Sequence, residues 1–476
     1  MAGTQNHRSF LDHHRGAGID RPRQFEDSMM LSMDKQPQQH EDLNYLVVGL
    51  GVTGFAVASY LLKHGYRCKV QDNRDIPPYM QQLRNRFPKV KIERQELDAD
   101  LIEWADALVV SPGLSIHQTR IRQAAEMGKH VIGDIELFAQ AVDKPVVAIT
   151  GSNGKSTVTR LLGDMIECDG KRAGVGGNIG TPALDLLQTP VDFYVLELSS
   201  YQLETTYSLQ PMVAAVLNVS EDHLDRYQSY TDYIQAKFHI YQGARVCVSN
   251  SDDETTRHDA NDITFSLNPE VEANFRVIHD DGTWLAHRAE AWLNVNELKI
   301  SGRHNWANCL AAMALAHEMG ISKRAIIEAM KHFTGLPHRS QWVAEADGVE
   351  WINDSKATNV GAAKASIEGR ERPVILIAGG QSKNADMSVL YPVLEQRVKL
   401  VLLMGMDADI IERAWRGATL IERVDSMKCA VARAYGQAER GDCVLLAPAC
   451  ASFDMYEKFE ARGDDFMQQV RRLLDV

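Results

Sequence analysis

The segment with the clearest chemical signature is a glycine-rich turn that ends in a lysine and two hydroxyl residues. The apolar run 146–149 leads into TGSNGKST, and a helical apolar pattern follows at once. Backbone N–H groups of such a loop, together with the positive end of the next helix, favour an anion, so the segment predicts a phosphate site. Lys155 would neutralise the outer phosphates and the Ser156 hydroxyl would contact Mg²⁺. An ordinary strand–turn–helix with a solvated lysine is the alternative, because Ile149 stands five before Gly154 where a standard P-loop has glycine.

Polar residues also stand where neighbouring strands are expected to end. Glu197 stands near the end of the run VLEL, where it is suited to hold Mg²⁺; a solvent-facing glutamate of an edge strand is the alternative. His223 follows MVAAVLNVS between Asp222 and Asp225, and Asn178 lies in the glycine-dense GVGGNIG; a plain loop residue is the competing interpretation of each. Ligands of open α/β sheets bind at the carboxyl ends of the strands, so we expect the three strand ends at 150, 197–199 and 219–223 to converge on one site.

Two expected helices carry polar residues whose role the pattern leaves open. Lys237 lies within a helix expected over 231–244, and the pattern alone favours an exposed lysine. Asn305 and Asn308 open the helix expected within 302–320. They lie one turn apart on one face, where they can cap the helix or bind a base or ribose.

An earlier glycine motif predicts a second phosphate-type site. GLGVTG follows an apolar run that opens at Tyr45; an amphipathic helix comes next, and Asp72 ends the following apolar run. In this context the glycines of G-x-G-x-x-G let the backbone approach a diphosphate, and the acidic residue reaches a ribose or base. The geometry predicts a diphosphate ligand without choosing between NAD and another nucleotide. A further run, 106–113, ends in a tight turn at the same expected edge.

The last part of the chain alternates strand and helix again. The apolar runs VILIAGG, LVLLMG and CVLLAPA are separated by helical stretches, which predicts a parallel, Rossmann-like sheet. Polar residues gather just after expected strand ends at 354–358, 381–383 and 449–452.

The composition narrows the classes of function. Apolar residues make up 45% and charged residues 24% of the 476 residues, as in soluble globular proteins. The net charge of −13 argues against nucleic acid as a partner. Seven scattered cysteines without a CxxC pair favour reduced thiols in a cytoplasmic protein. No apolar run approaches ~18 residues, so no membrane insertion is expected.

Length and motif spacing predict an α/β protein of three domains. Residues 1–43, rich in polar residues and without sustained periodicity, are expected to be a disordered and dispensable leader. Folded domains are predicted at 44–143 (Rossmann-like), 144–337 (P-loop ATPase-type) and 338–476 (Rossmann-like). Three nucleotide-type domains in series suggest an enzyme that gathers several ligands in a cleft between them.

The order of the motifs resembles the Mur ligase family. TGSNGKST, ELSSYQLE, NVSEDHLDRY, GRHNWANCLAAMALA, LPHRS, NDSKATN and APACASFDMYEKFEARG follow one another as in that family, over about residues 44–476. The folylpolyglutamate synthases share the central pattern but lack a UDP-binding first domain. The Asn-Pro-Arg motif of the Mur ligase that adds diaminopimelate is not evident here.

The resemblance implies a cytoplasmic, ATP-dependent amide-bond ligase of peptidoglycan precursor synthesis. ATP would phosphorylate the carboxylate of UDP-N-acetylmuramoyl-L-alanine, and the amine of D-glutamate would attack the acyl phosphate, leaving ADP and phosphate. The first domain would hold the UDP-sugar, the central domain ATP and the last domain the amino acid. We expect the enzyme to be a monomer.

The same resemblance assigns residues to each ligand. ATP would contact Gly151, Ser152, Asn153, Gly154, Lys155, Ser156, Thr157, Asn305, Asn308, Arg339 and Asp354. The UDP-sugar would contact Thr53, Asp72, Asn73, Arg74, Gly113 and Asn178, and D-glutamate would contact Thr358, Lys383, Ser452 and Phe459. One Mg²⁺ would lie on Ser156 and Glu197 and a second on His223 and Lys237, with Lys237 converted by CO₂ into an anionic carbamate. Lys155, Glu197, His223 and Lys237 would form the catalytic set.

One departure from the family and two rival functions stay open. GGQSKNAD has Gln381-Ser382 where an Asp-Gly type turn is common in the family, which leaves the shape of the loop around Lys383 open. An NAD-dependent oxidoreductase fused to a P-loop kinase would explain both glycine motifs. A nucleotide sensor would keep both loops without releasing phosphate in response to an amino acid.

Overall fold

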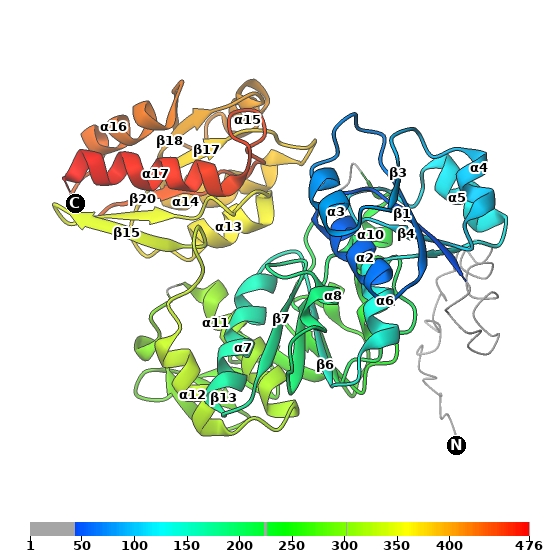
Figure 1. Ribbon diagram of the computed structural model, residues 1–476. Coiled ribbons are helices and arrows are strands. Elements are labelled where there is room, and N and C mark those ends of the chain that lie inside the picture. Colours follow the sequence, from blue (N-terminus) through cyan, green and yellow to red (C-terminus); the bar gives the residue numbers. More distant parts are fainter. Residues whose placement is uncertain (1–42, 223–225, 301, 476) are drawn as a thin grey trace, which may run out of the picture.

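The computed structural model describes residues 43–222, 226–300 and 302–475. Its strands form separate sheets with helices packed on their faces, and the predicted α/β class with three sheet-based parts is confirmed (Figure 1). Almost all of the predicted leader, together with the predicted metal ligand His223, lies outside the described residues.

The first sheet has the strand order β3-β2-β1-β4-β5, and its pairs are parallel. The order reverses direction between β1 and β4, which is where open α/β sheets bind ligands. Its strands are β1 (Asn44–Val48), β2 (Arg67–Gln71), β3 (Lys91–Glu93), β4 (Ala107–Val110) and β5 (His130–Ile132). Its helices are α2 (Val52–Lys63), α3 (Met80–Arg86), α4 (Ala99–Trp104), α5 (Thr119–Glu126) and α6 (Asp134–Ala141).

The central sheet has the order β14-β13-β12-β11-β10-β9-β6-β8-β7. Its pairs from β7 to β12 are parallel, and β12, β13 and β14 form an antiparallel meander. The strands are β6 (Val146–Thr150), β7 (Ala173–Gly177), β8 (Phe193–Glu197), β9 (Val213–Val216), β10 (Val246–Asn250), β11 (Ile263–Ser266), β12 (Phe275–His279), β13 (Thr283–His287) and β14 (Glu290–Asn294). The helices are α7 (Lys155–Cys168), α8 (Ala183–Leu186), α9 (Ser200–Leu203), α10 (Tyr230–Phe238), α11 (Arg303–Glu318) and α12 (Lys323–His332), with 3₁₀ turns η2 (His239–Tyr241), η3 (Glu254–Thr256) and η4 (Val295–Glu297).

The third sheet has the order β15-β16-β20-β17-β18-β19. It is parallel apart from its edge strand β15, which pairs antiparallel with β16. The strands are β15 (Gln341–Ala346), β16 (Val349–Asn353), β17 (Val374–Gly379), β18 (Val398–Met404), β19 (Leu420–Arg423) and β20 (Cys443–Leu446). The helices are α13 (Val360–Glu368), η5 (Met387–Leu390), α14 (Tyr391–Arg397), α15 (Ala408–Trp415), α16 (Met427–Gln437) and α17 (Phe459–Leu474).

The helix predicted over 231–244 is shorter than expected. Ser229 caps α10 by accepting the Asp232 N–H, but the α-helix ends at Phe238 and tightens into η2. Tyr241 explains the change, because its hydroxyl donates to the Val248 carbonyl at 2.7 Å and accepts the Val216 N–H at 3.1 Å. These bonds hold the end of the segment against β9 and β10.

The three sheets are joined in two different ways. One buried apolar cluster contains Val47 and Phe138 of the first part together with Ala148 and Tyr194 of the central part, so these two parts share a continuous core. The buried apolar clusters of the third sheet contain buried residues of the third part only, from its strands, helices and loops. Figure 1 shows the first and third sheets on opposite upper flanks of the central sheet. Within the described ranges, no helix is both long and apolar enough to cross a lipid bilayer.

Candidate active site

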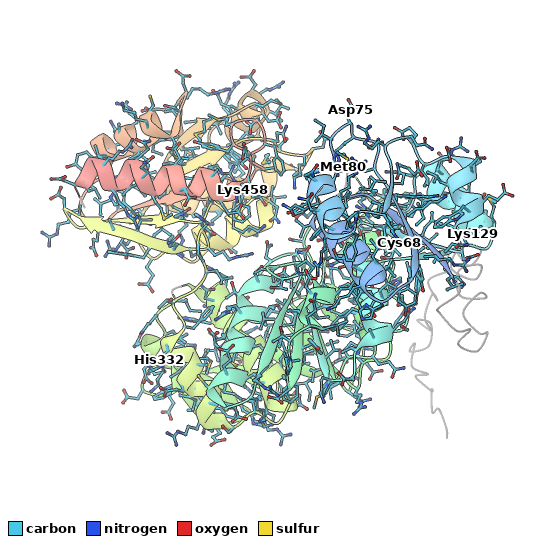
Figure 2. The ribbon with its side chains drawn as sticks, viewed as in Figure 1. Cys68, Asp75, Met80, Lys129, His332 and Lys458 are labelled. Carbon is cyan, nitrogen blue, oxygen red and sulfur yellow. The ribbon has the colours of Figure 1, made fainter. Side chains whose placement is uncertain are left out.

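A cavity of about 940 Å³ lies where the central and third parts meet. Its walls come from the β6–α7 loop, the ends of β8 and β9, the start of α11 and the loops at the strand ends of the third sheet. Figure 2 shows Lys458, one of the lining residues, on the side of the third part that is turned toward Asp75 and Met80 of the first part. The predicted convergence of strand ends on one site therefore holds for the segments after β6, β8 and β9.

The β6–α7 loop has the backbone shape that a phosphate site needs. Gly151 has φ +153° and Gly154 has φ +83°, and Gly154 directly precedes the first turn of α7. A Cβ added at Gly154 would lie 2.3 Å from the Asn308 Oδ1 atom, so this close approach and the positive φ both favour glycine here. The N-terminal N–H groups of α7 are thereby presented to the cavity.

Lys155 holds its amine over this loop. Its Nζ donates to the Gly151 carbonyl at 2.7 Å and to the Ser152 carbonyl at 3.0 Å. Burial of the amine lowers its pKa, the Glu197 carboxylate opposes that shift and the Arg339 charge adds to it. A solvated lysine on an ordinary turn does not fit these contacts.

Glu197 is buried at the end of an interior strand. β8 lies between β6 and β7, so the alternative of a solvent-facing edge glutamate is wrong. The Ser156 hydroxyl donates to Glu197 Oε2 at 2.6 Å, and the Asn178 amide donates to Oε1 at 2.8 Å. The structure thus brings together a hydroxyl and a carboxylate oxygen, which are the donors that hard cations prefer.

Lys237 is buried beside the phosphate loop, with 2% of its surface exposed, so the exposed lysine that the pattern alone favoured is wrong. Its Nζ donates to the Gly151 carbonyl at 3.0 Å and lies 4.4 Å from the centre of the Tyr233 ring. In the part of the chain that the structure describes, no carboxylate forms an ion pair with it. Burial and then the nearby Lys155 charge lower the pKa of Lys237 well below its usual value.

Two further cations face the same cavity. Arg339, from the segment that links α12 to β15, donates from its guanidinium to Ser156 Oγ at 2.6 Å. Lys356 lies over the Phe459 ring at 4.2 Å, and burial, together with the charges of Arg339 and Lys155, lowers its pKa to about 8. A protein with a net charge of −13 thus concentrates buried positive charge here, as a site for several anionic groups requires.

The start of α11 provides a surface suited to a base or ribose. Asn305 and Asn308 line the cavity, and the Asn308 amide donates to Asn305 Oδ1 at 3.2 Å. Phe265 and Ala311 add apolar surface beside the two amides. Asp354 is also among the lining residues.

All four predicted D-glutamate residues line the same cavity from the third part: Thr358, Lys383, Ser452 and Phe459. The loop that departs from the family pattern is tied down by Ser382, whose N–H and hydroxyl both donate to Asp407 Oδ2 at 2.7 Å. Lys383 follows with φ +53°, in the left-handed region of backbone conformation.

The predicted UDP-sugar residues of the first part do not line this cavity. Thr53, Asp72, Asn73, Arg74 and Gly113 lie at the carboxyl edge of the first sheet, and Asn178 alone of the predicted set reaches the cavity. Asp72 accepts the Leu50 N–H at 2.7 Å and two guanidinium bonds from Arg74, which hold the pKa of its carboxyl at about 2. Asp72 therefore holds the backbone of the glycine loop at Leu50.

The structure adds Asn218 and Asp222 to the site, two residues to which motif analysis assigned no ligand. Asn153 and Asn218 exchange two hydrogen bonds, of 2.8 and 3.0 Å, that tie the phosphate loop to the end of β9. Asp222 accepts a bond from the Asn359 amide at 3.0 Å and so links the central to the third part. The signal that could have found them is the density of Asn and Asp in NVSEDH and NDSKATN.

Comparison with known proteins gives a consistent result along the chain. Residues 43–133 match the N-terminal domain of MurD-like Mur ligases, 149–316 the Mur ligase middle domain, and 338–450 the glutamate ligase domain of Mur ligases. A UDP-N-acetylmuramoylalanine–D-glutamate ligase of Pseudomonas aeruginosa is 47% identical over 438 residues, covering 90% of this chain and 98% of that protein. The ligase of the same name from Nitrosococcus oceani is 46% identical over 453 residues, covering 94% of this chain and all of that protein (100%).

Solved structures share the fold. A pseudomurein peptide ligase type C from Methanothermus fervidus superimposes with a TM-score of 0.60 at 19% identity, over 91% of this chain and 100% of that one. The UDP-N-acetylmuramate-alanine ligase of Thermotoga maritima gives a TM-score of 0.58 at 17% identity, over 90% of this chain and 100% of that one. At these identities the likeness concerns the fold alone.

Proposed function

The chain belongs to the Mur ligase family, and we propose that it joins D-glutamate to UDP-N-acetylmuramoyl-L-alanine with consumption of ATP, in peptidoglycan precursor synthesis. The observation that carries the proposal is the likeness, across nine-tenths of the chain, to relatives named for this ligation. The cavity supports it, because it gathers a phosphate loop, buried cations and strand-end hydroxyls from two parts of the chain.

The proposed reaction has two steps. The alanine carboxylate attacks the γ-phosphorus of ATP, the bond to the ADP oxygen breaks, and an acyl phosphate forms. The neutral amine of D-glutamate then attacks the acyl carbon, the bond to the phosphate oxygen breaks, and the spare proton leaves to solvent. The products are an amide, ADP and phosphate.

Within this reaction the loop Gly151–Thr157 binds the phosphates through its N–H groups, and Lys155 neutralises charge on the transferring phosphoryl group. Among the described residues, the Lys155 amine donates to the carbonyls of Gly151 and Ser152, which leaves its positive charge available to an anion. We further propose that Asn305, Asn308, Arg339 and Asp354 contact the nucleotide.

The pair Ser156 and Glu197 fits Mg²⁺, since a hydroxyl oxygen and a buried carboxylate oxygen lie within 2.6 Å of each other. Bound Mg²⁺ would supply charge neutralisation for the phosphates. Arg339 and Asn178 hold this pair in position, because each donates a hydrogen bond to one of its members.

We propose that Lys237 is carbamylated and that its carbamate, with His223, binds a second Mg²⁺. Its lowered pKa supports the first part, because CO₂ adds to the neutral amine, which loses one proton as the N–C bond forms. The carbamate would convert a buried cation into the anion that a second metal requires. His223 lies outside the described residues, so its part rests on the sequence resemblance.

The remaining assignments follow the three parts of the chain. The UDP-sugar is proposed to bind Thr53, Asp72, Asn73, Arg74, Gly113 and Asn178, and D-glutamate Thr358, Lys383, Ser452 and Phe459. We place the domain boundaries at 44–143, 144–337 and 338–476, and propose a monomer that acts in the cytoplasm, where ATP is available.

The experiment that tests the function is phosphate release with ATP, Mg²⁺ and UDP-N-acetylmuramoyl-L-alanine across a panel of D- and L-amino acids. Release that requires the UDP-sugar and is strongest with D-glutamate is expected. Release without any amino-acid dependence would favour a nucleotide sensor or simple ATPase. Tight NAD binding with none of the UDP-sugar would favour the oxidoreductase alternative.

A further inference from the structure

A thiol, an imidazole and a carboxylate meet at a place separate from the active-site cavity. Cys247 lies on β10, while His258 and Asp262 belong to the segment that leads back to the adjacent strand β11. The sulfur of Cys247, a ring nitrogen of His258 and a carboxylate oxygen of Asp262 all lie within 4.8 Å of one another. None of the three lines the cavity described above.

Hydrogen bonds from the backbone hold the Asp262 carboxylate of this cluster in a fixed orientation. Its Oδ2 accepts the backbone N–H groups of His258 and Asp259, each at 3.3 Å. Oδ1 faces the His258 ring, with 3.5 Å between Oδ1 and Nδ1, and the Asp262 side chain is 3% exposed. One carboxylate oxygen is thereby committed to the backbone, and the other is directed at the imidazole and the thiol.

The imidazole ring of His258 packs against two aromatic side chains. The His258 ring centre lies 4.7 Å from that of Tyr241 and 6.4 Å from that of Phe238, the latter edge to face. Tyr241 is itself fixed by its hydrogen bonds to Val216 and Val248. The ring therefore has a supported position on one side and solvent access on the other, which gives an ion a route of entry.

One sulfur, one nitrogen and one oxygen donor at this spacing form a set suited to a borderline-soft cation. Ligand atoms of a tetrahedral site with bonds of ~2.0–2.3 Å lie ~3.3–3.8 Å apart, so the distance between His258 and Asp262 already fits and the thiol needs a small movement. Mg²⁺ avoids thiolate, which separates this cluster from the proposed catalytic metals.

We propose that Cys247, His258 and Asp262 bind one late first-row divalent cation, of which Zn²⁺ is the expected example, with water as a further ligand. The cation forms a bond to sulfur as the thiol proton leaves to solvent, accepts the lone pair of the neutral imidazole and binds the carboxylate. Its two positive charges are balanced by the thiolate and the carboxylate. Binding ties the loop between η3 and β11 to β10.

The electrostatic surroundings agree with a cation at this point. Burial, and then the carboxylates of Asp262 and Asp259, raise the pKa of the Cys247 thiol to about 11. The same carboxylates stabilise a positive ion. A metal must therefore displace the thiol proton, and binding is expected to strengthen as the pH rises.

Cobalt(II) titration of the full chain in excess Mg²⁺ tests the proposal. One equivalent of Co²⁺ should produce a near-ultraviolet thiolate-to-cobalt band and, in weakly buffered solution, release close to one proton. The active-site cavity has no cysteine among its lining residues, so cobalt in a Mg²⁺ site cannot produce this band. Zn²⁺ should abolish the band by displacement and raise the melting temperature.

Cys247→Ser should lose the band, and His258→Ala should weaken cobalt binding at least tenfold. The matched control is Cys168→Ser, which removes an exposed thiol and should keep the band. Because the His258 ring is partly exposed, His258→Ala should fold normally and keep its ligase rate, which makes the test independent of the proposed function. Absence of the band in the wild type, or an unchanged band in Cys247→Ser, would overturn the proposal.

Discussion

Lys155 and Lys237 donate hydrogen bonds to the same acceptor, the carbonyl oxygen of Gly151, at 2.7 and 3.0 Å. Two ammonium groups on one carbonyl repel each other, and each lowers the affinity of the other for a proton. Such an arrangement is stable only when anions bind nearby or when one amine is neutral or modified. It therefore favours the phosphate binding proposed for Lys155 and the carbamylation proposed for Lys237.

Lys155→Ala should reduce turnover by a factor of ~10³ or more, because the variant lacks the charge that stabilises the transferring phosphoryl group. The fold should survive, since the side chain contacts loop carbonyls and not the apolar core. Steady-state phosphate release and circular dichroism measure the two effects. Lys89→Ala, at an exposed lysine, is the control; near-wild-type turnover in Lys155→Ala would contradict the assigned role.

Lys237→Ala should be nearly inactive, and acetate should restore part of the activity by placing a carboxylate where the carbamate stood. Lys364→Ala, at an exposed lysine of α13, should be fully active and insensitive to acetate. A ¹³C resonance from labelled CO₂, present in the wild type and absent in Lys237→Ala, would show the modification directly. Full activity of Lys237→Ala after removal of CO₂ would exclude it.

Arg339→Lys should lower kcat/KM for ATP by ~10- to 100-fold. A lysine keeps the charge but cannot reproduce the direction of the guanidinium N–H that holds Ser156 Oγ. The exposed Arg324 gives the matched control Arg324→Lys. If both variants have the same kinetic constants as the wild type, the bond to Ser156 has no part in nucleotide binding.

Arg226 connects the central part to the proposed UDP-sugar loop. Its guanidinium donates to the carbonyls of Pro112 and Leu114, at 2.7 and 2.9 Å, on either side of Gly113, and its plane lies 3.6 Å from the centre of the Tyr201 ring. Arg226→Gln should raise the KM for the UDP-sugar by ~10-fold and leave the KM for ATP nearly unchanged, because the loop around Gly113 loses the hydrogen bonds at Pro112 and Leu114.

The matched control for this prediction is Arg245→Gln, at an exposed arginine of the same part of the chain. Initial-rate kinetics with each substrate varied in turn measure the two constants. An equal rise in both KM values in Arg226→Gln would point to general destabilisation instead of a positioning role.

Asp134 should make the stability of the protein depend on pH. Burial raises the pKa of its carboxyl from 3.8 to about 6, and Gln202 donates a side-chain hydrogen bond to it, at 3.2 Å. An acid whose pKa is higher in the folded state destabilises the fold when ionised. The penalty is absent below pH ~4, grows between pH ~4 and 6, and is fully present above pH ~6.

Asp134→Asn should therefore become more stable relative to wild type as the pH rises from 4.5 to 7.5, by ~2 kcal/mol across this range. Urea unfolding at the two pH values measures the difference. A stability difference that does not change with pH would show that the Asp134 carboxyl has an ordinary pKa in the folded state.

The local motifs were sufficient to predict the phosphate loop, the strand-ending Glu197 and the α/β class. Glycine positions, β-branched runs and helical periodicity act over a few residues, so the sequence displays them directly. The family assignment is confirmed for the same reason, because ordered motifs persist along the chain whatever their spatial arrangement. The site assignments for individual ligands remain predictions.

The tertiary structure determined which side chains are buried and which groups they contact. Lys237 looked like an exposed helical lysine, and the packing of α10 against the phosphate loop buries it. The pattern predicted that Asp72 reaches a ribose or base, and the fold adds bonds to its oxygens from Arg74 and the Leu50 N–H that the pattern did not show. Arg339 reaches Ser156 across 183 residues of sequence. No local pattern encodes such contacts, because burial and pairing depend on which surfaces meet once the sheets have assembled.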